Sequence, residues 1–213
     1  MTIHPPQITQ DKDSIKINFK VNSGNTNRTL WYSIQQEHEE LLSNSCDAAL
    51  LALLIPAMAE GEDIHVEGAI SGKLWHNLMR SYQHIAYQVM PWLKKINITA
   101  TTLSSTNSQG EGVLAGFSGG VDSYSLLHDY YYSDIPKHLK LTHLLFNNVG
   151  SHGRKNPQAL FETRFQRLLP IAKEIGLPII QVNSNVADFY TGKLTFTRTD
   201  NIRNASVALL LQG

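Results

Sequence analysis

The second half of the chain alternates strand-like and helix-like segments in a regular order. Three apolar runs predict strands, over 113–117, 141–147 and 179–183. Helical patterns follow them, over 121–132, 157–175 and from about Arg203 onward. Continuous apolar strands that alternate with helices are typical of a parallel sheet with helices on both faces. We therefore expect an α/β fold for residues 113–213.

The first half predicts a smaller α/β domain, over residues 1–103. Residues 1–13 are polar and are expected to form a loose arm. Strand and helix patterns follow in the order 14–21 (strand), 28–34 (strand), 47–59 (helix), 63–68 (strand), 71–93 (helix) and 96–103 (strand). The first two strands predict a hairpin, and Asp47 and Ser71 are candidate helix caps. The small polar stretch 104–112 predicts a linker between the two domains.

Composition excludes several functional classes. The 213 residues contain 18 Lys and Arg and 18 Asp and Glu, so binding of nucleic acid through bulk charge is not expected. Cys46 is the only cysteine, which excludes an intrachain disulfide and a cysteine cluster for zinc within these residues. The longest apolar run, 48–59, is far shorter than the ~20 residues of a membrane-spanning helix. A cytoplasmic protein is the simplest expectation.

The stretch Ser-Gly-Gly-Val-Asp-Ser, residues 118–123, lies between the first apolar strand and a helix. Two glycines allow a ligand to approach the backbone closely, and a helix N-terminus attracts anions. Ser118 and Ser123 add hydroxyl groups, whereas Asp122 would repel a bare phosphate. Asp122 therefore indicates either a magnesium ion between carboxylate and phosphate or a cap on the loop backbone. The stretch lacks the lysine of a Walker loop, and it is not a GxGxxG motif.

The stretch Phe117–Ser123 resembles the SGGxDS signature of the N-type ATP pyrophosphatases, the PP-loop superfamily. The resemblance implies a flavodoxin-like (adenine nucleotide alpha hydrolase-like) sheet and cleavage of ATP between its α and β phosphates. It implies ATP binding by Phe117, Ser118, Gly119, Gly120, Val121, Asp122 and Ser123. Within this set it gives Ser118, Asp122 and Ser123 catalytic roles, with Asp122 as a candidate Mg²⁺ ligand. The alternative is a glycine-rich turn that serves only packing.

A second segment, Asp200–Gln212, is similar to a helix-start segment of the 7-cyano-7-deazaguanine synthases. In that family the segment lies near nucleotide and substrate, which implies a catalytic role for Arg203 and a binding role for Asn204. The alternative is a surface arginine followed by an asparagine cap. Those synthases also hold zinc in a C-terminal cysteine cluster, so zinc is expected only if such a cluster lies beyond Gly213. We expect the second domain to continue past that residue.

Polar residues also follow the other two predicted strands. Ligands of open α/β sheets bind beyond the carboxyl ends of strands. By the PP-loop resemblance, Phe146 and Asn147 are candidates to contact adenine, and His152 and Arg154 are candidates for phosphate or substrate. Ser184 and Asn185 are candidates for substrate contact or for capping the next helix. A polar surface loop is the alternative for the residues that follow the second strand.

The expected activity is an AMP-forming ligase or amidotransferase. A carboxylate or amide oxygen attacks the α-phosphate, pyrophosphate leaves, and a nitrogen nucleophile then displaces AMP. The expected partners are ATP, Mg²⁺ and a small-molecule or modified-base substrate, and a homodimer stays open. One alternative is a tRNA-thiolating enzyme of the same superfamily, disfavoured by the single cysteine and zero net charge. The other is a nucleotide-binding module without catalysis.

Overall fold

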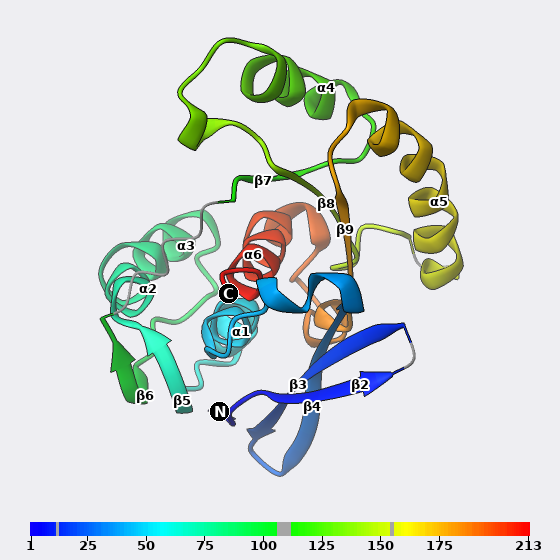
Figure 1. Cartoon of the computed structure of the whole chain (residues 1–213). Coiled ribbons are helices and arrows are strands. Elements are labelled where there is room, and N and C mark those ends of the chain that lie inside the picture. The colour runs from blue at the N-terminus through cyan, green and yellow to red at the C-terminus, as the bar shows by residue number, and fades with distance from the viewer. Residues whose placement is uncertain (12, 106–111, 154–155) are drawn as a thin grey trace.

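The computed structural model describes residues 1–11, 13–105, 112–153 and 156–213. Within these ranges the protein is an α/β structure built on one nine-stranded sheet (Figure 1). The strand order is β6-β5-β1-β3-β4-β9-β8-β7, and β2 pairs with β3 beside this path. Parallel and antiparallel neighbours both occur, so the sheet as a whole is mixed. In the described residues no helix is both long and apolar enough to cross a membrane.

The predicted hairpin near the N-terminus is confirmed. Strands β3 (Ser14–Ser23) and β4 (Thr26–Gln35) pair antiparallel along their whole length. The prediction of a loose arm over 1–13 is wrong, because β1 (Thr2–Ile3) and β2 (Gln7–Asp11) both pair with β3. Every residue of β2 is exposed. The sequence of β2 shows no alternation of buried and exposed side chains, so the strand is recognised only from its pairing with β3.

The remaining elements of the first half match the predicted order. After a 3₁₀ segment (Gln36–Leu41) come α1 (Asp47–Glu60), β5 (Ile64–Ser71), α2 (Gly72–Asn77), a π-helical segment (Leu78–Tyr82), α3 (Gln83–Val89) and β6 (Ile98–Ser104). Ser71 caps α2, since its Oγ accepts a hydrogen bond from Leu74 N at 3.0 Å. The cap predicted for Asp47 is wrong: Cys46 holds that position, and the Asp47 carboxylate accepts from Ser71 N at 2.8 Å.

The second half contains the predicted parallel strands. β7 (Leu114–Gly116), β8 (His143–Asn147) and β9 (Ile179–Ser184) pair parallel in that order. Between them lie α4 (Val121–Leu127) with its π-helical continuation (His128–Tyr132), a 3₁₀ turn (Lys137–Leu139) and α5 (Pro157–Ile175). A 3₁₀ turn (Val186–Phe189) precedes α6 (Phe196–Leu210). The predicted start near Arg203 is wrong, because α6 begins at Phe196 and Arg203 lies in its middle.

The two halves of the chain share the sheet. β4 pairs antiparallel with β9, and Tyr32 lies opposite Ser184. The strands of the first half thereby extend the parallel set β7–β9 instead of forming a sheet of their own. The division at 1–103 and 113–213 stays a prediction, and most of the predicted linker 104–112 lies outside the described residues.

Different helices cover the two faces of the parallel strands. Successive side chains of a strand point to opposite faces. In β8, Leu144 and Phe146 join a hydrophobic cluster with Phe161 and Phe165 of α5, whereas Leu145 joins a larger cluster with α1 and α6. Figure 1 shows α4 and α5 apart from the pair α1 and α6. The prediction of helices on both faces is confirmed for this part of the sheet.

Candidate functional site

The glycine-containing loop has an ordered backbone shape. Ser123 is buried in the first turn of α4, and its Oγ accepts a hydrogen bond from Ser118 N at 3.0 Å. The two hydroxyl oxygens lie 3.3 Å apart. Gly119 has a φ of +73°, in the left-handed region that suits glycine, and Gly120 caps the helix without a side chain. Ser123 therefore fixes the loop, while the Ser118 side chain stays exposed.

An open cleft of about 890 Å³ lies beside this loop, at the carboxyl ends of β7 and β8. Six residues predicted from sequence line it together: Phe117, Ser118, Phe146, Asn147, His152 and Asn204. They come from the loop, from the end of β8 and the segment after it, and from α6. Segments separated by dozens of residues thus meet at the edge of the sheet where ligands of α/β folds bind.

His152 also lines the cleft, and its hydrogen bonds define its tautomer. Its Nε2 lies 3.1 Å from Asn147 O, and since a carbonyl only accepts, Nε2 carries the proton. Nδ1 then accepts from Nη1 of Arg164 at 3.2 Å. Burial lowers the pKa of His152 below its ordinary value, the nearby Arg164 charge lowers it further, and the Asn147 hydrogen bond opposes both. The neutral ring is thereby favoured.

Phe146 contributes to the cleft mainly as a packed ring. It stacks on Phe161 with the ring centroids 5.2 Å apart, and it is almost fully buried. His152 lies edge-on to it at 5.3 Å. The aromatic packing holds the end of β8 against α5. The contact with adenine that was predicted for Phe146 would be made by its backbone groups, and it stays a prediction.

Arg203 lies apart from the cleft. Its guanidinium is buried, donates to Thr199 Oγ1, Val149 O and Leu194 O at 2.9, 3.3 and 3.0 Å, and lies 3.8 Å from the Tyr190 ring centroid. These contacts join α6 to the loop after β8 and to the segment before α6. The structure does not bring Arg203 to Ser118, although its neighbour Asn204 reaches the cleft.

The remaining predicted loop residues are not among the described residues that line the cleft. These are Gly119, Gly120, Val121, Asp122 and Ser123. Val121 and Asp122 are exposed on the first turn of α4. Within the described ranges, no three His, Cys, Asp or Glu side chains come together as a metal site.

The polar residues after β9 serve the fold. Ser184 Oγ donates to Asn148 O at 2.6 Å and accepts from Val186 N at 3.4 Å, so it caps the following turn. The Asn185 side chain accepts from Trp31 N at 2.8 Å and donates to Thr29 O at 2.9 Å, which fixes the β4–β9 junction. The predicted candidate Arg154 lies outside the described residues.

The two cationic residues of the described lining were missed from the sequence: Arg164 and Arg167 of α5. They lie three positions apart, the spacing that places two side chains on one face of a helix. Both are exposed. Their spacing, within a helix that follows a strand of the sheet, was the one available signal.

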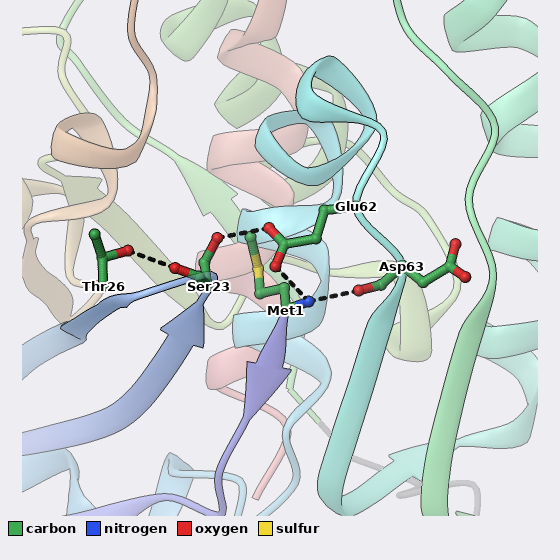
Figure 2. A network of polar contacts seen from close by, with 5 residues as sticks. All are labelled: Met1, Ser23, Thr26, Glu62 and Asp63. Carbon is green, nitrogen blue, oxygen red and sulfur yellow. Dashed lines mark hydrogen bonds and ion pairs between the residues drawn. The ribbon is translucent and has the colours of Figure 1, made fainter.

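A second, smaller cavity of about 370 Å³ lies away from the loop. Trp92 and Phe189 line it with the cations Lys193 and Arg28, and Arg28 stacks on Phe189 at 3.9 Å. Its rim is an internal network, shown in Figure 2: the Met1 ammonium contacts a Glu62 carboxylate oxygen at 2.7 Å, and Ser23 Oγ donates to the other oxygen at 2.6 Å. None of the predicted site residues is among the described residues that line this cavity.

Family models, curated proteins and solved structures were compared with the chain, and none matches it.

Proposed function

We propose that the cleft binds ATP and that the protein is an AMP-forming ligase of the PP-loop type, with a flavodoxin-like nucleotide-binding sheet. One observation carries the proposal: Ser118 of the SGGVDS loop, Asn147 at the end of β8 and Asn204 of α6 line the same cleft. A loop with a nucleotide-binding signature that led into a packed interior would have favoured the packing-only alternative. Here it opens onto a space in the size range of nucleotide pockets.

The lining of the cleft includes both apolar and polar side chains, as ATP has both an apolar base and a polar phosphate chain. Leu114, Leu145, Ala205 and Ala208 line part of it. Leucine and alanine side chains offer an apolar slot of the kind that a purine ring fills, with Asn147 and Asn204 as hydrogen-bonding groups beside it. Ser118 also lines the cleft, and it precedes the start of α4, where backbone N–H groups and the helix dipole favour phosphate.

The reaction we propose is adenylation of an acceptor oxygen. A carboxylate or amide oxygen forms a bond to the α-phosphorus, the bond to the bridging α–β oxygen breaks, and pyrophosphate leaves with that electron pair. AMP stays on the acceptor until a nitrogen nucleophile displaces it. The loop holds the phosphates and orients the α-phosphorus toward the acceptor. The acceptor we propose is a small molecule, and 7-deazaguanine-type chemistry is one candidate.

Magnesium fits this site only in part. Asp122 is the carboxylate on the loop, exposed at the first turn of α4. Mg²⁺ in nucleotide sites is usually held by one or two carboxylates together with the phosphates and water. Asp122 would hold the ion jointly with the nucleotide, and the ion would neutralise charge on the departing pyrophosphate. Zinc would need the cysteine cluster expected only beyond Gly213.

The test is incubation of the protein with γ-labelled ATP, Mg²⁺ and candidate carboxylate or amide acceptors, followed by chromatography. We expect label in pyrophosphate, with AMP formed in equal amount. Label in orthophosphate with ADP as co-product would contradict the proposal. Saturable ATP binding without turnover for any acceptor would favour the nucleotide-binding module.

A further inference from the structure

One face of α5 contributes to the lining of the cleft. Arg164, Arg167 and Leu168 of this helix all line the cleft. A Cβ built on Gly119 would lie 3.1 Å from Leu168 Cδ2, so the loop rests on α5 at that residue. Arg167 precedes Leu168, and Arg164 lies about one turn earlier in the helix. The two guanidinium groups therefore belong to the same wall as the loop.

Arg164 is oriented by a buried histidine. His152 is 2% exposed and packs against the rings of Phe146 and Phe161. Its Nε2–H is engaged by Asn147 O, which leaves Nδ1 as the acceptor for Arg164 Nη1 at 3.2 Å. A neutral acceptor occupies one donor of the guanidinium without cancelling its charge. The other donors of the fork stay available to a ligand.

The charges of the cleft point to an anionic ligand. Among the described residues that line it, Arg164 and Arg167 are cationic and none is Asp, Glu or Lys. The whole chain, by contrast, has a formal net charge of zero. The sequence from Gly112 to Pro136 contains no lysine, so the loop and α4 supply no lysine ammonium to a phosphate. In the part of the lining that the structure describes, the cationic groups come from α5.

We propose that Arg164 and Arg167 form an anion clamp for a diphosphate group, and that His152 is a positioning residue for Arg164. Guanidinium forks match the oxygen geometry of phosphates and bind them with charge-assisted hydrogen bonds. The inference rests on the proposed function for its source of diphosphate: in the ligase, the clamp holds the β and γ phosphates of ATP and then the departing pyrophosphate. A free diphosphate, or another diphosphate-containing substrate, presents the same chemistry.

The test is calorimetric titration of the folded protein with inorganic pyrophosphate, ATP and AMP. The variants are Arg164→Gln, Arg167→Gln and the double variant, and the control is Arg80→Gln, an exposed arginine between α2 and α3. We expect pyrophosphate to bind the wild type, and each cleft variant to weaken it roughly tenfold or more. AMP lacks the diphosphate, so its affinity should change less than that of ATP. Absence of pyrophosphate binding to the wild type, or equal binding by the double variant, would overturn the clamp.

The outcomes separate the clamp from the proposed function. Release of AMP and pyrophosphate by the wild type, with pyrophosphate affinity unchanged in the double variant, would refute the clamp and leave the ligase standing. Arginine-dependent binding of pyrophosphate by a protein that ignores adenine nucleotides would support the clamp and refute the ligase. The free-pyrophosphate and ATP titrations thus distinguish the two sources of the diphosphate.

The positioning role of His152 has its own readout. His152→Ala should weaken pyrophosphate binding, and His152→Gln should restore most of it, because an amide can donate to Asn147 O and accept from Arg164. In an Arg164→Gln background, His152→Ala should have no further effect on pyrophosphate affinity. Equal effects of His152→Ala in both backgrounds would show that His152 does not act through Arg164.

Discussion

Helices α1 and α5 lie in two regions that use their side chains differently. In α1 every residue from Asp47 to Met58 is buried, and the helix lies in the larger hydrophobic cluster with α6. In α5 only Phe161, Phe165, Leu168 and Ala172 are buried, a single stripe at helical spacing. A helix enclosed on all sides contributes to stability alone. A helix with one buried stripe holds the sheet and also presents polar groups, and Arg164 and Arg167 are such groups beside the cleft.

The arginines of α5 and α6 show the same contrast. Arg203 is 3% exposed and donates to backbone carbonyls and Thr199, so its charge serves the fold. Burial lowers the pKa of Arg203, although the Tyr190 and Asp200 side chains oppose that shift. Arg164 and Arg167 are exposed, and the cleft offers them no described acidic partner. Arginine is thus structural in one region and available to a ligand in the other.

The largest predicted difference between the regions concerns apolar packing. Leu54→Ala in α1 removes a fully buried side chain and leaves a cavity, so the free energy of unfolding should fall by about 2–5 kcal/mol. The matched control is Leu169→Ala in α5, where the leucine is 37% exposed and the loss should be below about 1 kcal/mol. Urea denaturation of both variants measures the difference. Equal losses would contradict the division into an enclosed and a one-sided helix.

The next effect concerns the two kinds of arginine. Arg203→Met should destabilise the fold by about 1–3 kcal/mol, because buried carbonyl partners lose a charged donor. Arg164→Met should change the free energy of unfolding by no more than about 0.5 kcal/mol, as exposed substitutions usually do. Thermal and denaturant unfolding compare them. If Arg203→Met lost pyrophosphate binding without being destabilised, the structural role of Arg203 would be contradicted and a role in ligand binding supported.

A smaller effect is predicted within the loop. Gly119→Ala places a side chain in the left-handed region and against Leu168, so it should cost about 1–2 kcal/mol. The matched control is Gly120→Ala. Gly120 has a φ of −87°, which any residue adopts, and a Cβ added there would lie 3.5 Å from Ser118 Oγ, an ordinary contact. Its stability should therefore stay close to that of the wild type. Urea denaturation of the two variants measures the cost of the left-handed backbone at Gly119. Equal destabilisation of the two variants would contradict the loop geometry.

The smallest predicted effect is a dependence of stability on pH. The pKa of His152 is lowered in the folded state, chiefly by burial, and that of His143 is lowered for the same first reason. These two rings therefore bind a proton less readily in the folded protein than in the unfolded chain. Their contribution to the free energy of unfolding is present above the unfolded pKa of ~6.5 and is lost as pH falls below it.

Melting temperatures should accordingly decrease between about pH 7.5 and pH 5. His152→Gln cannot be protonated, so the decrease should be smaller in this variant. A variant with the same pH profile as the wild type would show that His152 does not contribute.

Local sequence pattern predicted most elements but not how the halves join. Helix α5 matches its predicted range 157–175, because its apolar stripe and its flanking Asn156 and Gly176 are local signals. The start of α6 was missed, since Phe196–Asn201 is mostly polar and carries no clear apolar periodicity. The β4–β9 pairing joins residues about 150 positions apart. No short-range pattern encodes such a pairing.

The candidate site shows the same limit. The loop and the end of β8 could be predicted, because parallel strands bring their carboxyl ends to one edge of the sheet. Arg164 and Arg167 could not, since their spacing of three places them on one face of a helix but does not indicate what that face meets. Arg203 was singled out by resemblance, and only the tertiary packing shows that its guanidinium is enclosed by α6 and the loop after β8.

Hydrogen exchange with and without ATP and Mg²⁺ tests the central claim most directly, because it reports on both regions and on both cavities in one experiment. The account predicts slower exchange of amides over 117–124, 147–152 and 203–208, with little change in α1 or around Phe189. Protection of the segments that line the smaller cavity, near Glu60, Trp92 and Phe189, with none in the SGGVDS loop, would contradict the assignment of the cleft as the nucleotide site.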